Sequence, residues 1–261
     1  AMFPCARFDD LTPGAEHSFA LKGLQEAVVA RRLEDVVPAL KRVEDLTAQG
    51  LWAGGFVAYE AAPAFDPALR VRQRLSTDPF RHLPLVWFGI FLRRELAEAL
   101  EPRTVHPAPY HASAWIPDSD RAKYDAALGS IRDHIAAGDT YQVNHTFRLR
   151  AAFSGDPFEL YRDLVLAQRG SYAACFDTGR HRIVSASPER FFRVTDKQIE
   201  VRPMKGTAPR GRWPDEDRAS ADHLRSSEKD HAENLMIVDL LRNDLGRIAD
   251  FGSVTVDKLL E

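Results

Sequence analysis

The sequence contains little cysteine, no long apolar run and no large excess of charge of either sign. Its two cysteines, Cys5 and Cys175, match no metal-binding or redox motif, which excludes a cysteine-based site and fits a reducing compartment. No apolar stretch approaches the ~20 residues of a membrane-spanning helix, and the first residues lack the regions of a signal peptide. A formal net charge of −3 provides no basic surface for nucleic acid. We therefore expect a cytoplasmic globular protein that binds neither membranes nor nucleic acid.

The composition is ordinary for a globular protein. The chain has 261 residues, 44% hydrophobic and 28% charged, which is enough for one large domain or two small ones. Four prolines between Glu101 and Pro117 indicate a connector. We therefore expect an N-terminal α+β region over residues 2–110 and a second region over residues 116–261.

Periodic patterns predict the individual elements of an α/β or α+β layered fold. Apolar residues at helical spacing predict helices over residues 33–49, 119–138 and 226–243, and one that begins at Asp156. That last helix is expected to bury its apolar stripe, Leu160, Leu164 and Ala167. Apolar or alternating runs predict strands over residues 51–59, 84–92, 172–176, 183–187, 190–194, 198–202 and 254–259.

A further strand is predicted over residues 139–149, where Val143, His145 and Phe147 alternate with polar residues. Because His145 shares the apolar face, we interpret it as a core histidine and not as a catalytic one. Cys175 lies in an apolar run and is expected to be a small core residue.

The segment Val201–Thr207 carries a lysine in an unusual setting. The predicted strand over 198–202 must end at Pro203, which has no N–H for a further ladder bond. Gly206 permits a turn or a close approach of the backbone to another group. Lys205 could therefore point into a site, although these seven residues by themselves favour a solvated lysine in a Pro/Gly turn.

Chemistry at this lysine would require a proton acceptor. A lysine amine is a nucleophile only when neutral, and with its ordinary pKa of ~10.4 this requires roughly 4–5 kcal/mol at pH 7. Glu189 is the candidate acceptor, because a proton passed to it would create a nucleophile and a general acid together. The alternative for Glu189 is a salt bridge with Arg190 or Arg193.

Three motifs together resemble those of the chorismate-utilising enzymes, which include anthranilate, aminodeoxychorismate, isochorismate and salicylate synthases. They are Ser185–Phe191, the segment with Lys205, and Ala232–Arg247. Lys205 stands 16 residues after Glu189 and 28 residues before Glu233, as in the family. Anthranilate synthases of the family carry alanine at the position of Lys205, whereas aminodeoxychorismate synthases carry lysine. The chain is therefore most similar to component I of the aminodeoxychorismate synthases.

The resemblance implies a fold, an activity and roles for particular residues. The fold would be the layered α+β sandwich of anthranilate synthase component I, with residues 116–261 as the first part of the chorismate-binding domain. Lys205 would attack C2 of chorismate while Glu189 protonates the departing C4 hydroxyl. Ammonia would then give 4-amino-4-deoxychorismate, the precursor of 4-aminobenzoate and folate. Gly206 and Thr207 would bind the substrate.

The resemblance also implies a cofactor and a partner. Glu233 matches a glutamate that holds Mg²⁺, a cation that needs only one or two carboxylates besides water and substrate oxygens. The alternative for Glu233 is a helix-face charge near Lys229. Ammonia would come from a separate glutamine amidotransferase subunit.

The sequence also departs from the family, because the family's later motifs Gly-Ser-x-Thr-Gly-Ala-Pro-Lys and Ile-Arg-Thr and its second magnesium glutamate are absent. The chain is therefore expected to be an N-terminal fragment that is inactive alone. Two other hypotheses remain. One is an anthranilate synthase component I or another chorismate enzyme, and the other is a non-catalytic chorismate-binding module.

Overall fold

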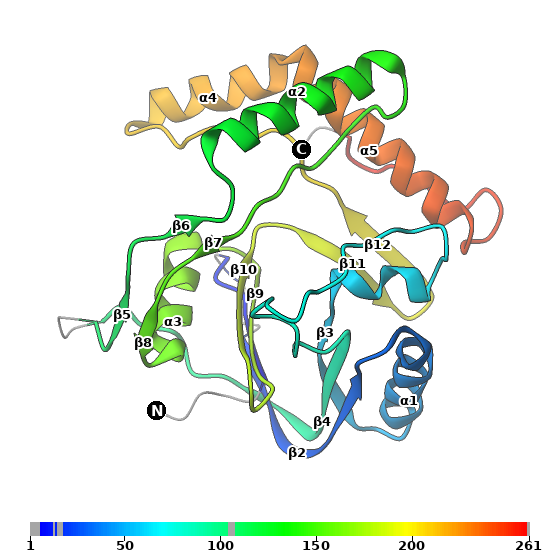
Figure 1. Cartoon of the computed structure of the whole chain (residues 1–261), viewed down its shortest axis with the longest axis vertical. Helices are drawn as coiled ribbons and strands as arrows, with labels where there is room; N and C mark the ends of the chain where they lie inside the picture. Colours follow the sequence, from blue (N-terminus) through cyan, green and yellow to red (C-terminus); the bar gives the residue numbers. More distant parts are fainter. Residues whose placement is uncertain (1–5, 13, 15–17, 104–107, 260–261) are drawn as a thin grey trace. The chain divides into compact units, whose positions relative to one another are not determined.

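The computed structural model describes residues 6–12, 14, 18–103 and 108–259, so Cys5 lies outside the described residues (Figure 1). The chain divides into two compact units. Unit 1 comprises Ala1–Ala114 and Ala151–Pro188, and unit 2 comprises Trp115–Arg150 and Glu189–Glu261. The sequence predicted one boundary near residues 110–116, whereas these units are discontinuous, because strands formed by residues 172–187 pair back onto the N-terminal strand.

Unit 1 is built on one six-stranded antiparallel sheet in the order β10-β9-β1-β2-β4-β3. Its strands are β1 Ala6–Asp9, β2 Phe19–Ala30, β3 Trp52–Val57, β4 Val86–Leu96, β9 Tyr172–Asp177 and β10 Arg182–Ser187. The strands predicted over 51–59, 84–92, 172–176 and 183–187 are thus confirmed. A short ladder of the same unit joins β5 Tyr110–Ala112 to β8 Phe153–Gly155.

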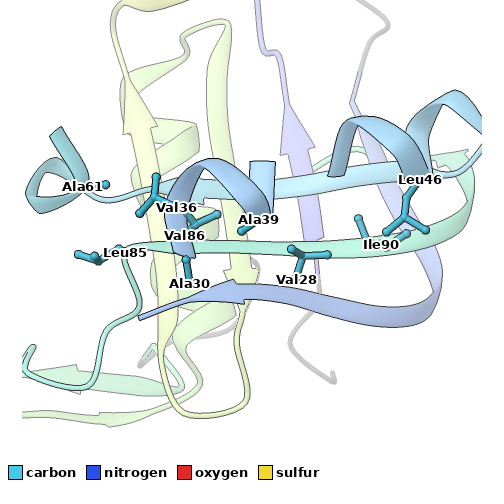
Figure 2. Packing of buried hydrophobic residues seen from close by; sticks show 9 residues of the cluster. All are labelled: Val28, Ala30, Val36, Ala39, Leu46, Ala61, Leu85, Val86 and Ile90. Carbon is cyan, nitrogen blue, oxygen red and sulfur yellow. The ribbon is translucent and has the colours of Figure 1, made fainter. Parts of the chain in front are cut away.

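One face of this sheet is covered by α1 Val36–Ala48, which follows the short 3₁₀ helix η1 Leu33–Asp35 and confirms the helix predicted over 33–49. A second 3₁₀ helix, η2 Tyr59–Ala64, follows β3. Figure 2 shows α1 lying over the strands, with the side chains of Val36, Ala39 and Leu46 directed toward them. The buried cluster consists of Val28, Ala30, Val36, Ala39, Leu46, Ala61, Leu85, Val86 and Ile90.

The second helix of unit 1, α3 Pro157–Gln168, begins as predicted, with the Asp156 side chain accepting a hydrogen bond from the Phe158 N–H at 2.9 Å. The predicted buried face of Leu160, Leu164 and Ala167 is wrong. Phe158, Tyr161 and Val165 are buried instead, whereas Leu164 is 41% exposed. Both sets recur at helical spacing, so only the direction from which the sheet packs against α3 decides which set is buried.

A buried polar cluster joins α3 to β1. The Arg7 guanidinium makes two hydrogen bonds to Asp9, at 2.8 and 2.7 Å, and the Tyr161 hydroxyl donates to Asp9 Oδ2 at 2.6 Å. Burial, and then the charge of Asp9, raise the pKa of the Tyr161 phenol. Cys175 is fully buried beside them, as predicted, and burial raises the pKa of its thiol to about 12. Two groups, the Arg7 guanidinium and the Tyr161 hydroxyl, therefore satisfy one carboxylate that has no access to water.

Tyr161→Phe is expected to lower the free energy of unfolding by about 2 kcal/mol, because it removes a hydrogen bond to a buried charged group. Tyr59→Phe provides the control, since Tyr59 is 81% exposed and its hydroxyl is accessible to water. Denaturant unfolding of both variants measures the difference. A Tyr161→Phe protein as stable as Tyr59→Phe would contradict a stabilising role for this bond.

Unit 2 contains three helices, α2 Arg121–Ala137, α4 Pro214–Ser226 and α5 Glu228–Gly246 (Figure 1). Gly138 ends α2 in a left-handed conformation (φ 80°), as its position in the sequence predicted. The antiparallel hairpin of β11 Arg190–Thr195 and β12 Gln198–Arg202 confirms the two strands predicted there. A two-residue ladder joins β6 Ile116–Pro117 to β7 Leu149–Arg150.

Two strand predictions in unit 2 are wrong. Residues 139–149 form no strand before β7 begins at Leu149, and no strand occurs within residues 254–259. His145 is correspondingly not a core residue. It is exposed, with its ring 5.5 Å from that of Tyr124 and 6.5 Å from that of Phe147. Alternation of apolar and polar residues yields a strand only where a neighbouring strand supplies hydrogen-bond partners, and here the partner strand β6 pairs only with Leu149 and Arg150.

Unit 2 also buries little apolar surface. No residue of α2, α4 or α5 is fully buried, and the three buried apolar clusters among the described residues all lie in unit 1. Large apolar side chains such as Leu235 and Ile248 are exposed, by 49% and 72%. Within the described part of the chain, no helix combines the length and apolar character needed to cross a membrane.

Candidate active site

The residues predicted to carry chemistry lie together in unit 2, around the open end of the β11–β12 hairpin. Arg190 pairs with Arg202 at that end. Glu189 precedes β11 directly, and Lys205 follows β12 by three residues. The antiparallel pairing therefore places two residues that are 16 positions apart in the sequence at the same end of one hairpin.

A hydrogen bond fixes Glu189 to the lysine segment. Its Oε1 accepts the backbone N–H of Met204, the residue before Lys205, at 3.2 Å. Pro203 ends the ladder between Arg202 and Met204, so the N–H of Met204 does not pair with β11 and can bind a side chain. This contact gives the spacing between Glu189 and Lys205 a structural cause.

Lys205 as a residue is partly buried, and its amine donates to Asn144 Oδ1 at 3.4 Å. Asn144 lies in the irregular segment before β7, where the sequence predicted a strand. Sequence reasoning did not select Asn144 as a site residue. The contact shows that Lys205 is directed toward another polar side chain and is not a freely solvated turn lysine.

Gly206 is confirmed as a position that requires glycine. Its φ is +74°, a left-handed conformation that side chains disfavour. A Cβ added there would also lie 3.2 Å from the Cβ of Asp230. The lysine segment therefore approaches α5 closely at this point, and Thr207 follows on the exposed side.

Glu233 lies near this approach because it follows Asp230 by three positions, and residues so spaced are neighbours on a helix surface. Its carboxylate is 3.8 Å from the Lys229 amine, and its side chain is 34% exposed. This contact agrees with the alternative interpretation of Glu233 as a charge on the helix face near Lys229. The carboxylate also keeps access to solvent, which a metal ligand shared with a substrate would need.

The described residues contain no group of three or more His, Cys, Asp and Glu side chains placed to hold a metal ion. The described residues therefore do not form a metal site whose ligands all come from the protein. A single accessible carboxylate such as Glu233 nevertheless fits Mg²⁺ as one ligand, because this ion retains water and takes substrate oxygens.

Two buried polar atoms border the same segments without a hydrogen-bond partner in the described part of the chain. They are Gln142 Oε1, two residues before Asn144, and His231 Nε2, next to Asp230 on α5. Such atoms are uncommon in folded proteins, since an unmade buried hydrogen bond is unfavourable. Both atoms lie in segments that also contain a residue in contact with the lysine segment, Asn144 in one and Asp230 in the other.

Comparison with known proteins gives a consistent result. The sequence profile of the chorismate binding enzyme family matches residues 6–261. Aminodeoxychorismate synthase component 1 of Klebsiella aerogenes is 42% identical over 147 residues, which are 56% of this chain and 33% of the relative. Anthranilate synthase component 1 of Pseudomonas aeruginosa is 37% identical over 199 residues, 76% of this chain and 36% of the relative.

The fold agrees with that of a solved structure. Anthranilate synthase component I from Streptococcus pneumoniae superimposes with a TM-score of 0.74 at 22% sequence identity, covering 95% of this chain and 65% of that one. The α+β fold expected from the resemblance is thereby confirmed. The chain spans about a third of the length of the curated relatives in these matches, and about two thirds of the solved chain.

Proposed function

The chain belongs to the chorismate binding enzyme family, and on that premise we propose that it is part of component I of an aminodeoxychorismate synthase. The reaction would convert chorismate and ammonia to 4-amino-4-deoxychorismate, for 4-aminobenzoate and folate synthesis. The residue that carries this proposal is Lys205, where anthranilate synthases have alanine. Identity alone does not discriminate, because relatives of both kinds match at similar levels.

The geometry around Lys205 supports a nucleophilic role. Asn144 Oδ1 accepts from the amine, so the amine is oriented even before a substrate is present. Glu189 is attached to the neighbouring backbone through Met204. In a closed site without water, a proton passed from the ammonium to the carboxylate would leave both groups uncharged.

The proposed chemistry has two balanced steps. In the first, the neutral Lys205 amine forms a bond to C2 of chorismate, both ring double bonds shift by one position, and the C4 hydroxyl leaves as water with the proton of Glu189. In the second, ammonia forms a bond to C4, both double bonds shift back and the Lys205 amine departs from C2. Glu189, now a carboxylate, takes the proton released by the added ammonia.

Glu233 would hold Mg²⁺, which when bound would neutralise and orient a carboxylate of the substrate. Thr207 and the Gly206 N–H, beside the Asp230 turn of α5, would contact the substrate from the lysine segment. A glutamine amidotransferase subunit would supply the ammonia, in keeping with the designation of the Klebsiella relative as a component 1.

Glu233→Gln is expected to raise the Mg²⁺ concentration needed for half-maximal activity at least ~10-fold, because it replaces an anionic ligand by a neutral one of the same shape. Folding stability should change by less than about 1 kcal/mol, as for other partly exposed substitutions. Glu228→Gln, at the exposed start of the same helix, is the control. An unchanged Mg²⁺ requirement in Glu233→Gln would contradict a metal-binding role for Glu233 and leave its ion pair with Lys229 as its one contact in the described structure.

Product chromatography tests the proposed function directly. Enzyme made from the complete reading frame, supplied with chorismate, ammonium and Mg²⁺, should form 4-amino-4-deoxychorismate. Formation of anthranilate instead would favour an anthranilate synthase component I. The relative of that kind from Pseudomonas aeruginosa, 37% identical over 199 residues, supports this second candidate. Binding of chorismate by titration calorimetry without any turnover would favour a non-catalytic binding module.

A further inference from the structure

One face of the β11–β12 hairpin carries three arginines and one carboxylate. Arg190 is directly opposite Arg202, and Arg193 is opposite Glu200. Glu200 and Arg202 are two residues apart on β12, so they point to the same face. A register shift between Arg190 and Arg193 brings both of these arginines to that face as well. Glu200 is the one carboxylate among the residues paired in this ladder.

Glu200 contacts both arginines of the terminal pair through one oxygen atom. Its Oε1 is 2.5 Å from Arg202 Nε and 2.7 Å from Arg190 Nη2. The contact with Arg202, and then that with Arg190, lower the pKa of the Glu200 carboxyl. Glu200 is therefore a single anion between two cations that face each other.

The terminal pair needs such an anion. Like charges directly opposite each other destabilise a ladder, and the Arg190 side chain is only 7% exposed, so water screens it weakly. Its Nε and Nη2 have no hydrogen-bond acceptor among the described residues, because the 2.7 Å contact to Glu200 is an ion pair without hydrogen-bond geometry. The ion pair with Glu200 is thus the compensation that the structure provides for this buried charge.

The position of this pair in the chain connects it to the candidate active site. Arg190 follows Glu189 directly, and Arg202 precedes Met204 by two residues. The register shift interrupts the ladder beyond Arg190, so the Arg190–Arg202 pair is held by few neighbouring ladder bonds. If this pair separates, the Glu189 carboxylate moves away from the Met204 N–H and from Lys205.

We propose that Glu200 is a positioning residue, which closes the end of the hairpin by bridging Arg190 and Arg202 and so keeps Glu189 and Lys205 at a working distance. Glu200 contacts neither of these two residues in the structure and would not touch the substrate. The inference rests on the proposed function for the roles of Glu189 and Lys205, but not for the bridge itself.

The test is a double-mutant cycle in enzyme made from the complete reading frame, with wild type, Glu200→Gln, Arg202→Gln and the double variant. Hydrogen exchange of the segment 202–206 should be at least about fivefold faster in Glu200→Gln, because the end of the hairpin opens locally. The double variant should exchange more slowly than Glu200→Gln, since removing Arg202 also removes the repulsion. Asp196→Asn, in the turn at the far end of the hairpin, is the matched control and should exchange like wild type, since asparagine tolerates its left-handed φ of 53°.

Activity provides a second readout. Glu200→Gln should lower kcat about tenfold while KM for chorismate changes less than twofold, because the catalytic pair is displaced and substrate contacts are retained. Unchanged exchange in Glu200→Gln, or a double variant no better than the single one, would overturn the proposal. A raised KM at normal kcat would overturn it too. If wild-type enzyme forms no product, the proposed function fails, and the exchange cycle still decides whether Glu200 bridges the pair.

Discussion

Lys205→Ala is expected to slow formation of 4-amino-4-deoxychorismate at least ~100-fold and to abolish any covalent adduct with the substrate. A positioned catalytic group contributes about 10²–10⁴-fold in rate, and here the substitution also removes the atom that would bond to C2. Mass spectrometry of the enzyme after brief exposure to chorismate and Mg²⁺ measures the adduct. The assay with ammonium measures the rate.

The lysine at the hairpin turn provides the control for this substitution. Lys197 is exposed between β11 and β12, at the opposite end from Lys205. Lys197→Ala should retain both the adduct and the rate, because it changes the charge of the same hairpin without touching Asn144 or Glu189. Near-normal product formation by Lys205→Ala would exclude the covalent route and leave Lys205 as a binding group.

The 261 residues by themselves are expected to show no measurable turnover. The chain matches only 65% of the solved relative, and unit 2 has no buried apolar cluster among its described residues. The resemblance to the family implies further ligands for the metal and the substrate from motifs that this sequence does not contain. Each such charge-assisted contact contributes about 1.5–3 kcal/mol, so the loss of two corresponds to roughly 10²- to 10⁴-fold in rate.

The exposed apolar side chains of unit 2 predict that the 261-residue chain tends to associate. Leu235 on α5, and Ile248 and Phe251 beyond it, present apolar surface to water, and such surface promotes association. The 261-residue chain should therefore bind a hydrophobic dye more strongly than protein from the complete reading frame. Assays of the two proteins side by side provide the test. Comparable turnover from both would show that the site is complete within these residues.

Local features of the sequence predicted the surroundings of the candidate site well. Alternation identified β11 and β12, Pro203 marked the end of the ladder, and Gly206 marked a backbone position with positive φ. Each of these depends on residue chemistry that acts over a few positions, such as the missing N–H of proline or the missing Cβ of glycine. The helices α1, α2, α3 and α5 were predicted for the same reason, since capping residues and helical spacing are local, whereas α4 was not predicted.

Contacts between distant segments were decided by the tertiary structure alone. The sequence could not indicate that Asn144 meets Lys205 across 61 positions, or that the Met204 N–H binds Glu189. It also misassigned residues 139–149, because a strand needs hydrogen-bond partners that only the fold supplies. In α3, two apolar stripes were compatible with the sequence, and packing against the sheet buried Tyr161 instead of Leu164. The sequence thus indicated which residues are candidates for the chemistry, whereas which of them meet was decided by long-range pairing and burial, which no local pattern encodes.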